Sequence, residues 1–334
     1  MSDSAPYRVL ARKYRPQTFA ELVGQEAMVR TLTNAIESGR IAHAFILTGV
    51  RGVGKTTTAR IIARALNCTG ADGAGGPTIE PCGQCDSCRR IAEDRHVDVQ
   101  EMDAASRTGI DDIREIIESV RYAPASARFK IYIIDEVHML STQAFNGLLK
   151  TLEEPPPHVK FIFATTEIRK VPVTVLSRCQ RFDLRRIEPE TLIGHLAAIA
   201  ERESVEAERE ALTLIARAAE GSMRDGLSLL DQAIAHGGGR VLAAPVRDML
   251  GLADRGQVYE VYEGAMRGDA AGAIASLGRQ YDGGADPLVV LQDMLELTHW
   301  LTRIKVTPEA ADDPTMADAE RDSARQLAER LSMP

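Results

Sequence analysis

The chain has 334 residues, of which 44% are hydrophobic and 26% are charged. This composition supports a packed core and excludes the disordered, collagen-like and low-complexity classes, and the length suggests about two domains. The net charge of −8 excludes a uniformly basic coat for nucleic acid. The charge is uneven, however, because residues 1–186 carry 26 basic and 22 acidic side chains, whereas residues 187–334 carry 14 and 26. A polyanion should therefore meet the N-terminal half.

The sequence contains no apolar run of the roughly 18 residues that would suggest a membrane span. Its first residues, MSDSAPYRVLARKYRP, lack the apolar centre of a signal peptide. We therefore expect a cytoplasmic protein without a membrane partner, whose five cysteines are thiols or metal ligands rather than disulfides. Because the chain stops at Pro334 inside a helical pattern with no terminal cap, we expect it to be a truncated form of a longer protein.

In the first part of the chain, short apolar runs alternate with helical patterns. The short apolar runs predict strands at 44–48, 97–103, 130–137, 159–166 and 179–184, and the central strands are rich in Ile, Val and Phe. Amphipathic patterns predict helices at 57–67, 109–120 and 141–152. Strands that alternate with helices indicate an α/β fold with a parallel sheet covered on both faces.

After residue 186 the strand signal disappears and helical patterns dominate. Three short helices are expected between 188 and 236, and the glycines at 237–239 end this set. Another helical tract starts near Pro245. Further helices are expected at 257–267, 270–281, 287–305 and 316–331.

Residues 49–56 read GVRGVGKT and match the phosphate loop G-x-x-x-x-G-K-[ST]. The strand before the motif and the helix after it are the context that the motif requires, which argues against a chance glycine-rich turn. Backbone N–H groups of such a loop surround phosphates, and the helix N-terminus adds its positive end. Lys55 would reach the β- and γ-phosphates of ATP, and Thr56 would bind Mg²⁺. The nucleotide contacts expected here are Gly49, Val50, Arg51, Gly52, Val53, Gly54, Lys55, Thr56 and Thr57.

A second acidic motif, IYIIDEVH, follows a buried strand at 131–138. Asp135 at the strand end can hold Mg²⁺, and Glu136 can activate the attacking water, although a solvated acid is the alternative. Thr165 and Thr166 end the next strand, where a hydroxyl could report on the γ-phosphate or hold the water; ordinary strand-end threonines are the alternative. Arg224 opens a later helix and is either a site residue or part of a surface ion pair.

Cys82, Cys85 and Cys88 have C-x2-C-x2-C spacing, and Cys68 lies upstream at the expected end of the helix after the phosphate loop. Four thiolates complete a tetrahedral Zn²⁺ shell and leave no position for substrate, so the expected site is structural. Redox switching or free thiols are the alternatives. Cys179 is separate and is expected to be a small buried residue.

Several segments together resemble one protein family. They are YRVLARKYRPQTFAELVGQE, GVRGVGKTTTAR, the four-cysteine insertion, DAASRTGIDDIRE, YIIDEVHML, LLKTLEEPP, FATTE and LSRCQRFDL, in this order. The chain resembles the tau/gamma subunits of bacterial DNA polymerase III, the motors of the sliding-clamp loader, over residues 7–305. The resemblance implies an AAA+ P-loop NTPase domain at 1–186 with a zinc module at about 68–90, a lid at 187–243 and an incomplete helical collar at 244–334.

The resemblance also assigns roles to individual residues. Thr166, with Thr165, matches the first sensor and Arg224 the second, while Arg178 matches the arginine that reaches the ATP of a neighbouring subunit. Other positions match residues that close over the adenine (Ala11, Arg15 and Val23) or follow the DNA backbone (Arg107, Arg114 and Lys150). Gly109 stands where family members often carry a lysine. For Arg178 an intramolecular ion pair is the alternative, and for Arg107 and Arg114 it is a solvated helix face.

These features favour an ATPase that loads a ring-shaped clamp onto primed DNA. Its implied cofactors are ATP, Mg²⁺ and Zn²⁺, and its implied partners are the delta and delta prime subunits, further tau/gamma copies, the sliding clamp and primer-template DNA. One alternative is another AAA+ motor such as a Holliday-junction helicase, which would lack the four-cysteine insertion. The other is a non-catalytic scaffold subunit, against which the intact Lys55, Asp135 and Glu136 argue.

Overall fold

The computed structural model describes residues 7–251, 255–309 and 318–331. The chain divides into two compact units. The first contains the residues up to Leu192 together with Ala219–Ser228, and the second contains Ile193–Ala218 and the residues from Leu229 onward. In the described part of the chain, no helix is long and apolar enough to cross a membrane.

The first unit is built on a five-stranded sheet in which every pairing is parallel. Its order is β2-β3-β4-β1-β5, so β5 and β2 form the edges. All five strands predicted from the apolar runs are present, and no end differs from the prediction by more than two residues. They are β1 (Ala44–Thr48), β2 (Val99–Asp103), β3 (Lys130–Asp135), β4 (Val159–Thr165) and β5 (Gln180–Asp183).

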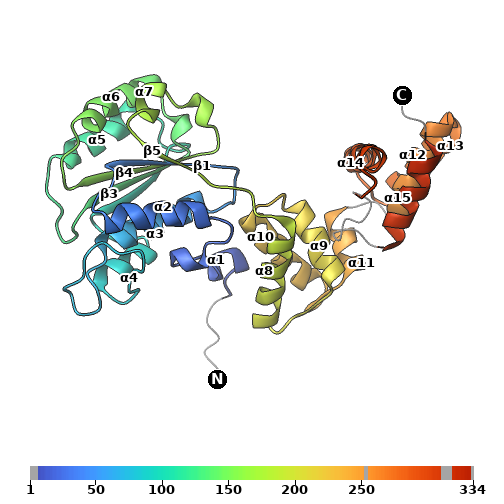
Figure 1. The fold of residues 1–334 in the computed structure, drawn as a ribbon, viewed down its shortest axis with the longest axis horizontal. Helices are drawn as coiled ribbons and strands as arrows, with labels where there is room; N and C mark the ends of the chain where they lie inside the picture. Colours follow the sequence, from blue (N-terminus) through green and yellow to red (C-terminus); the bar gives the residue numbers. More distant parts are fainter. Residues whose placement is uncertain (1–6, 252–254, 310–317, 332–334) are drawn as a thin grey trace. The chain divides into compact units, whose positions relative to one another are not determined.

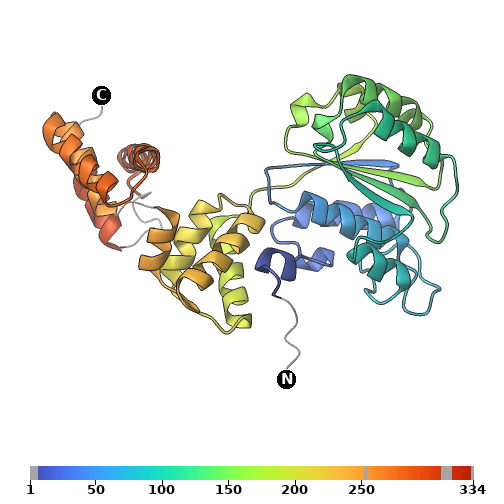
Figure 2. The same cartoon turned by 180° about the vertical axis from the view of Figure 1, so that it is seen from behind.

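Helices cover both faces of this sheet, as parallel crossovers require. Figure 1 shows α5 (Ile110–Val120), α6 (Thr142–Glu153) and α7 (Val173–Leu176) on one face. The other face carries α2 (Glu26–Glu37), α3 (Lys55–Asn67) and α4 (Asp86–Ala92), and the view from behind in Figure 2 shows the same layers.

The core follows from the two-residue alternation of side chains along each strand. In β3, Tyr132 and Ile134 belong to the apolar cluster that contains α5 and α6, whereas Ile131 and Ile133 belong to the cluster that contains α2 and α3. Burial on both faces explains why the central strands β1, β3 and β4 read as largely apolar runs. Their parallel pairing places their carboxyl ends beside one another.

Several elements of the first unit, most of them short, were not expected from the sequence. They are α1 (Leu10–Lys13), the 3-10 turns η1 (Phe19–Glu21), η2 (Val137–Met139) and η3 (Ile168–Lys170), and the helices α2, α4 and α7. In α2 only Met28 and Leu32 are fully buried, so its apolar pattern is sparse. The two η turns after β3 and β4 matter for the site described below.

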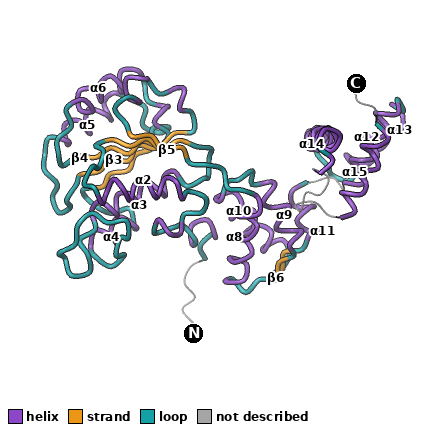
Figure 3. The backbone as a smooth tube through the Cα atoms, in the orientation of Figure 1, coloured by secondary structure: helices purple, strands orange, loops and turns teal. Residues whose placement is uncertain are grey.

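The helical part begins with the three expected helices, α8 (Pro189–Arg202), α9 (Arg209–Ala218) and α10 (Met223–His236). The expectation that no strand follows residue 186 is wrong, because β6 (Glu206–Ala207) and β7 (Arg240–Val241) form a parallel pair, seen in part in Figure 3. Two residues are too few to give an alternating pattern. The remaining helices are α11 (Ala243–Leu250), α12 (Arg255–Arg267), α13 (Ala270–Asp282), α14 (Pro287–Val306) and α15 (Asp318–Arg330).

The helices at the end of the chain have their own apolar core. Tyr262, Trp300 and Ala324 are buried in it, and α12 packs against α13 and α14 against α15. The helix predicted at 316–331 is thus present as α15, while residues 316 and 317 lie outside the described part.

Candidate nucleotide site and cysteine cluster

The glycine-rich turn between β1 and α3 has the backbone that a phosphate loop requires. Gly52 and Gly54 have φ values of 78° and 102°, and Gly54 is the N-cap of α3. A Cβ on Gly52 would lie 1.9 Å from the Oγ of Ser222, and the Arg224 N–H donates to the Gly52 carbonyl at 3.3 Å. Glycine at this position therefore lets the loop approach the segment that carries Arg224.

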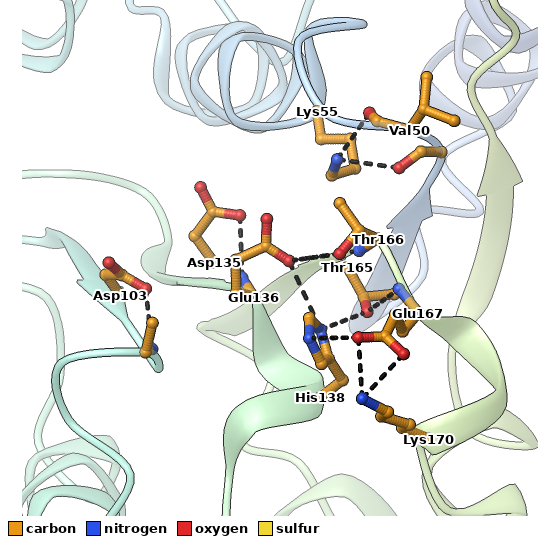
Figure 4. A network of polar contacts seen from close by, with 12 residues as sticks. Val50, Lys55, Asp103, Asp135, Glu136, His138, Thr165, Thr166, Glu167 and Lys170 are labelled. Atoms are coloured by element: carbon orange, nitrogen blue, oxygen red, sulfur yellow. Dashed lines mark hydrogen bonds and ion pairs between the residues drawn. The ribbon is translucent and has the colours of Figure 1, made fainter. Parts of the chain in front are cut away.

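Lys55 lies at the start of α3 with only 6% of its surface exposed. Its ammonium donates to the carbonyls of Gly49 and Val50, each at 2.9 Å, as Figure 4 shows. Burial lowers the pKa of this lysine, while the carboxylates of Glu136 and Asp135 act in the opposite direction. The lysine thus lies close enough to the two acids at the end of β3 for their charges to act on it.

Thr56, in the first turn of α3, contacts Asp135 at the carboxyl end of β3. The Thr56 hydroxyl donates to Asp135 Oδ2 at 2.6 Å, although the two residues are 79 positions apart. The other carboxylate oxygen accepts the N–H of Glu136 at 2.9 Å. A hydroxyl oxygen and a carboxylate oxygen beside a phosphate loop are suitable ligands for Mg²⁺, so the donor set fits the expected cation.

Glu136 is held by the strand that lies next to its own. Its backbone is left-handed, with φ 45° and ψ 45°, and its Oε2 accepts from the hydroxyl of Thr166 at 3.0 Å and from the N–H of Thr166 at 3.3 Å. Thr165 is fully buried and its hydroxyl instead lies 3.0 Å from His138 Nδ1. The structure therefore separates the two threonines: Thr166 contacts the candidate base, and Thr165 contacts a histidine that the sequence did not suggest.

The N-terminal residues expected near the adenine lie in different places. The Arg15 Nε donates to the Thr57 hydroxyl at 3.0 Å, and Arg15 lines a small hollow with Arg60 and Arg64. Burial, and then the nearby charge of Arg60, lower the pKa of Arg15. The remaining candidates are half-buried Ala11 in α1, half-buried Val23 between η1 and α2, exposed Arg51, half-buried Val50 and buried Val53.

The four cysteines predicted as zinc ligands form one cluster, here called the four-cysteine cluster (Cys68, Cys82, Cys85 and Cys88). Their sulfur atoms all lie within 4.8 Å of one another. A tetrahedral zinc site with Zn–S bonds of about 2.3 Å places its sulfurs about 3.8 Å apart, so the cluster fits the ion.

Local structure prepares the cluster for a metal. Cys68 ends α3, and Cys85 is the N-cap of α4, where it accepts the Cys88 N–H. Backbone N–H groups also point at the sulfurs of Cys68 and Cys82, at 3.3 Å to 3.4 Å. Cys179 lies elsewhere, packed against the core of the sheet, and burial raises its pKa to about 12.

Arg178 lies between α7 and the edge strand β5. Its guanidinium donates to Glu153 Oε1 at 2.7 Å and to the Thr174 carbonyl at 2.6 Å. Within the isolated chain, the arginine thus forms the intramolecular ion pair that the sequence left open as an alternative.

The residues expected to follow DNA lie on or near α5 and α6. Arg107 is exposed before α5, and Lys150 is exposed on α6. Arg114 is also exposed and pairs with Asp111 at 2.6 Å, as a solvated helix face would. Gly109 is the N-cap of α5. DNA contact by these residues stays a prediction.

Three consecutive stretches of the chain match known protein families. Residues 24–188 match the family described as DNA polymerase III, delta subunit. Residues 191–239 match the ATPase lid domain of the DNA polymerase III clamp loader subunit. Residues 241–334 match domain III of DNA polymerase III subunits gamma and tau.

Curated relatives cover nearly the whole chain. The chain is 42% identical over 302 residues to DNA polymerase III subunit gamma of Buchnera aphidicola from Acyrthosiphon pisum, spanning 90% of this chain and 82% of that protein. The chain belongs to the DNA polymerase III tau/gamma family. It is 48% identical over 304 residues to subunit tau of Escherichia coli, spanning 91% of this chain and 46% of that protein. The chain therefore spans about half the length of the tau relatives.

Solved structures with the same fold include the Holliday junction branch migration motor RuvB of Thermotoga maritima. The TM-score is 0.52 at 19% identity, covering 76% of this chain and 79% of RuvB. This likeness shows a shared P-loop NTPase fold and no more. The sequence relatives, in contrast, are tau and gamma subunits.

Proposed function

We propose that this chain is an ATP-hydrolysing motor subunit of a bacterial clamp loader, which opens the sliding clamp and places it on primed DNA. One observation carries the proposal: in a tau/gamma family chain, the Lys55 ammonium, the Thr56–Asp135 pair and the Glu136–Thr166 pair converge at the carboxyl ends of β1, β3 and β4. The implied partners are the delta and delta prime subunits, further tau/gamma copies, the clamp and primer-template DNA, in the cytoplasm.

Each residue has a distinct task in hydrolysis of the β–γ phosphoanhydride bond. Lys55 leaves the carbonyls of Gly49 and Val50 and donates to the phosphates instead. Thr56 and Asp135 would hold Mg²⁺, which neutralises phosphate charge when bound. Glu136 orients the attacking water and accepts its proton. The hydroxyl of Thr166 keeps the Glu136 carboxylate in place.

The remaining candidates act around this centre. Arg224, whose N–H contacts Gly52, would report nucleotide binding to the lid, and Arg15 would line the nucleotide pocket. Arg178 would complete the ATP site of a neighbouring subunit. The exposed side chains of Arg107, Arg114 and Lys150 would bind DNA phosphates without reading the bases. Zinc in the four-cysteine cluster would be structural, because four thiolates leave no open position.

Two substitutions test the motor in an assembly with the partner subunits, the clamp and primed DNA. Lys55→Ala should abolish ATP binding and clamp loading together. Glu136→Gln should keep ATP affinity within about twofold but lower stimulated hydrolysis by about 10²-fold or more, since an amide cannot accept the proton. Glu93→Gln changes an exposed acid at the end of α4; it is the matched control and should behave like the wild type.

The outcomes also separate the alternatives. Full clamp loading by Lys55→Ala would refute the motor assignment and favour a scaffold subunit. Hydrolysis stimulated by branched junction DNA but not by the clamp would favour a branch-migration motor instead. Normal turnover by Glu136→Gln would remove Glu136 from the role of base.

A further inference from the structure

A histidine, His138, lies beside Glu136, the candidate base. His138 lies in η2, three residues after Asp135, and only 6% of its side chain is exposed. Its ring lies between Glu136, Thr165 and Glu167, as Figure 4 shows. The ring is buried and titratable, it lies beside the candidate catalytic carboxylate, and none of the roles proposed for ATP hydrolysis uses it.

Both ring nitrogens face polar atoms from neighbouring elements. Nδ1 lies 3.0 Å from the Thr165 hydroxyl and 3.4 Å from Glu136 Oε2. Nε2 lies 3.4 Å from Glu167 Oε1, and Glu167 in turn pairs with Lys170 at 2.8 Å. The ring thereby links η2, the end of β4 and η3, and it connects Glu136 to an ion pair at the surface.

The ring adds a third polar contact to Glu136 Oε2. This oxygen accepts two hydrogen bonds from Thr166 and lies 3.4 Å from Nδ1. Because a carboxylate only accepts, the tautomer that carries its proton on Nδ1 is the one that can donate to Glu136. The Thr165 hydroxyl, which accepts the N–H of Glu167 at 3.0 Å, lies 3.0 Å from the same ring nitrogen and so contacts the ring edge that faces Glu136.

The backbone of Glu136 makes this packing consequential. A non-glycine residue at φ 45° is strained, and such strain persists only where the surroundings determine the conformation. The Met139 N–H donates to the Glu136 carbonyl at 2.9 Å, so the turn that holds the ring is the turn that holds the base. Without the ring, the Glu136 carboxylate would keep its two hydrogen bonds from Thr166 but lose its contact with Nδ1, and more rotamers would be open to it.

We propose that His138 is a positioning residue for Glu136, acting through its Nδ1 edge and Thr165. The inference rests on the proposed ATPase function, because it concerns the turnover that Glu136 supports. In the described part of the chain, the polar contacts of the His138 ring are with Thr165, Glu136 and Glu167 and none is with the phosphate loop, so its loss should affect the chemical step and leave nucleotide binding alone. A base displaced by a fraction of an ångström lowers the rate by about tenfold or more.

Three substitutions separate the contacts of the ring. His138→Phe keeps the volume and removes both nitrogens. Asn at 138 places a polar atom near the position of Nδ1, and Gln at 138 places one near the position of Nε2. The matched control is His158→Phe, because the His158 ring has one described hydrogen-bond partner, the carbonyl of Val120 at 3.3 Å.

We expect stimulated kcat to fall about tenfold in His138→Phe, with KM for ATP changed by less than about twofold. His138→Asn should recover most of the lost turnover, whereas His138→Gln should not. On a Glu136→Gln background, His138→Phe should cause no further loss. Equal losses on both backgrounds, or an Asn variant no better than Phe, would show a general structural role and overturn the proposal.

A second readout does not depend on turnover. In the nucleotide-free chain, the ring nitrogen NMR shifts of His138 should change in Glu136→Gln and in Thr165→Val, and stay unchanged in Glu93→Gln. If the wild-type assembly hydrolysed no ATP, the proposed function would fail while these shifts still reported the contact. Unchanged shifts in both variants would overturn the positioning role even in an active ATPase.

Discussion

Asp98 offers a stringent test of how the sheet supports the cysteine insertion. This carboxylate is 2% exposed just before β2. Its oxygens accept the N–H groups of Ala125, Ser126 and Ala127 at 2.7 Å to 2.8 Å, and the Ser126 hydroxyl at 3.2 Å. One side chain therefore satisfies three successive amides of the loop between α5 and β3.

That loop continues into the contacts beneath the insertion. The Arg128 guanidinium donates to the carbonyls of Leu66 and Gly75, each at 2.7 Å, and of Cys68 at 3.3 Å. Asn67 and Phe129 exchange two hydrogen bonds. Asp98 thus fixes the segment that anchors the end of α3 and the base of the four-cysteine cluster.

We expect Asp98→Asn to destabilise the first unit by about 2–3 kcal/mol at pH 7. The amide keeps one acceptor oxygen, so its NH₂ group must face at least one backbone N–H, and that charge-assisted bond, worth about 1.5–3 kcal/mol, is lost. The bonds that remain lose their ionic character and weaken by about half. The loop amides at Ala125 and Ser126 are exposed enough to regain water, which keeps the total below the sum of all four bonds.

The lowered pKa of Asp98 determines how the stability difference between the wild type and Asp98→Asn changes with pH. Burial alone would raise the pKa of Asp98, but the backbone and side-chain hydrogen bonds outweigh it and leave the pKa lowered. A folded-state pKa below the unfolded value of about 3.9 stabilises the protein above that pH, and the stabilisation is lost as the pH falls through the folded pKa. The difference between wild type and Asp98→Asn should therefore shrink below about pH 4.

Because the chain has two units, the measurement should be local. Hydrogen exchange of the β2 and β3 amides gives the opening free energy of the first unit, and Asp282→Asn, an exposed substitution on α13, is the control. Equal protection in wild type and Asp98→Asn at pH 7, or a constant difference down to pH 3, would refute the reasoning.

Two further outcomes follow from the site. Freshly purified reduced protein should contain one Zn²⁺ per chain by metal analysis, and a zinc-free protein would refute the metal site. Chelation of the zinc should increase hydrogen exchange over residues 68–90. ATP affinity should stay within about twofold, because none of the four zinc-binding cysteines belongs to the phosphate site. Arg178→Ala should leave ATP binding by its own subunit unchanged but lower DNA-stimulated hydrolysis in the assembly by about 10³-fold or more; a large loss of basal turnover in a demonstrably monomeric chain would place Arg178 in its own site.

The sequence predicted what short-range chemistry determines. The central strands were predictable because burial on both faces makes most of their positions apolar. The phosphate loop was predictable because its spacing places Lys55 and Thr56 on one turn. The cysteine cluster was predictable because C-x2-C-x2-C spacing brings three sulfurs to one side of a loop and helix. Cys68 joins them because the chain between α3 and Cys82, 14 residues later, folds back and brings Cys82 next to the end of the helix.

Contacts that depend on the register between strands were not predictable. His138 meets Thr165 across 27 residues only because β3 and β4 are paired with a particular alignment. Asp98 was expected to be part of a strand, yet it binds a loop 27 to 29 residues away. Single acids and histidines carry no local pattern that distinguishes these roles from ordinary surface positions.

The free energies of two interactions decide whether the ion pair between Arg178 and Glu153 excludes a role for Arg178 at a neighbouring ATP site. The ion pair with Glu153 joins side chains that are 32% and 51% exposed, and an exposed pair of this kind contributes only about 0–1 kcal/mol. An arginine that reaches a transferring phosphoryl group raises the rate by a factor of about 10³–10⁵, which corresponds to a barrier lower by roughly 4–7 kcal/mol. The intramolecular pair therefore costs little to break, and Glu153 can hold Arg178 in the single chain without preventing it from serving a neighbouring ATP site. A stronger partner, buried and bidentate, would have argued against action in trans.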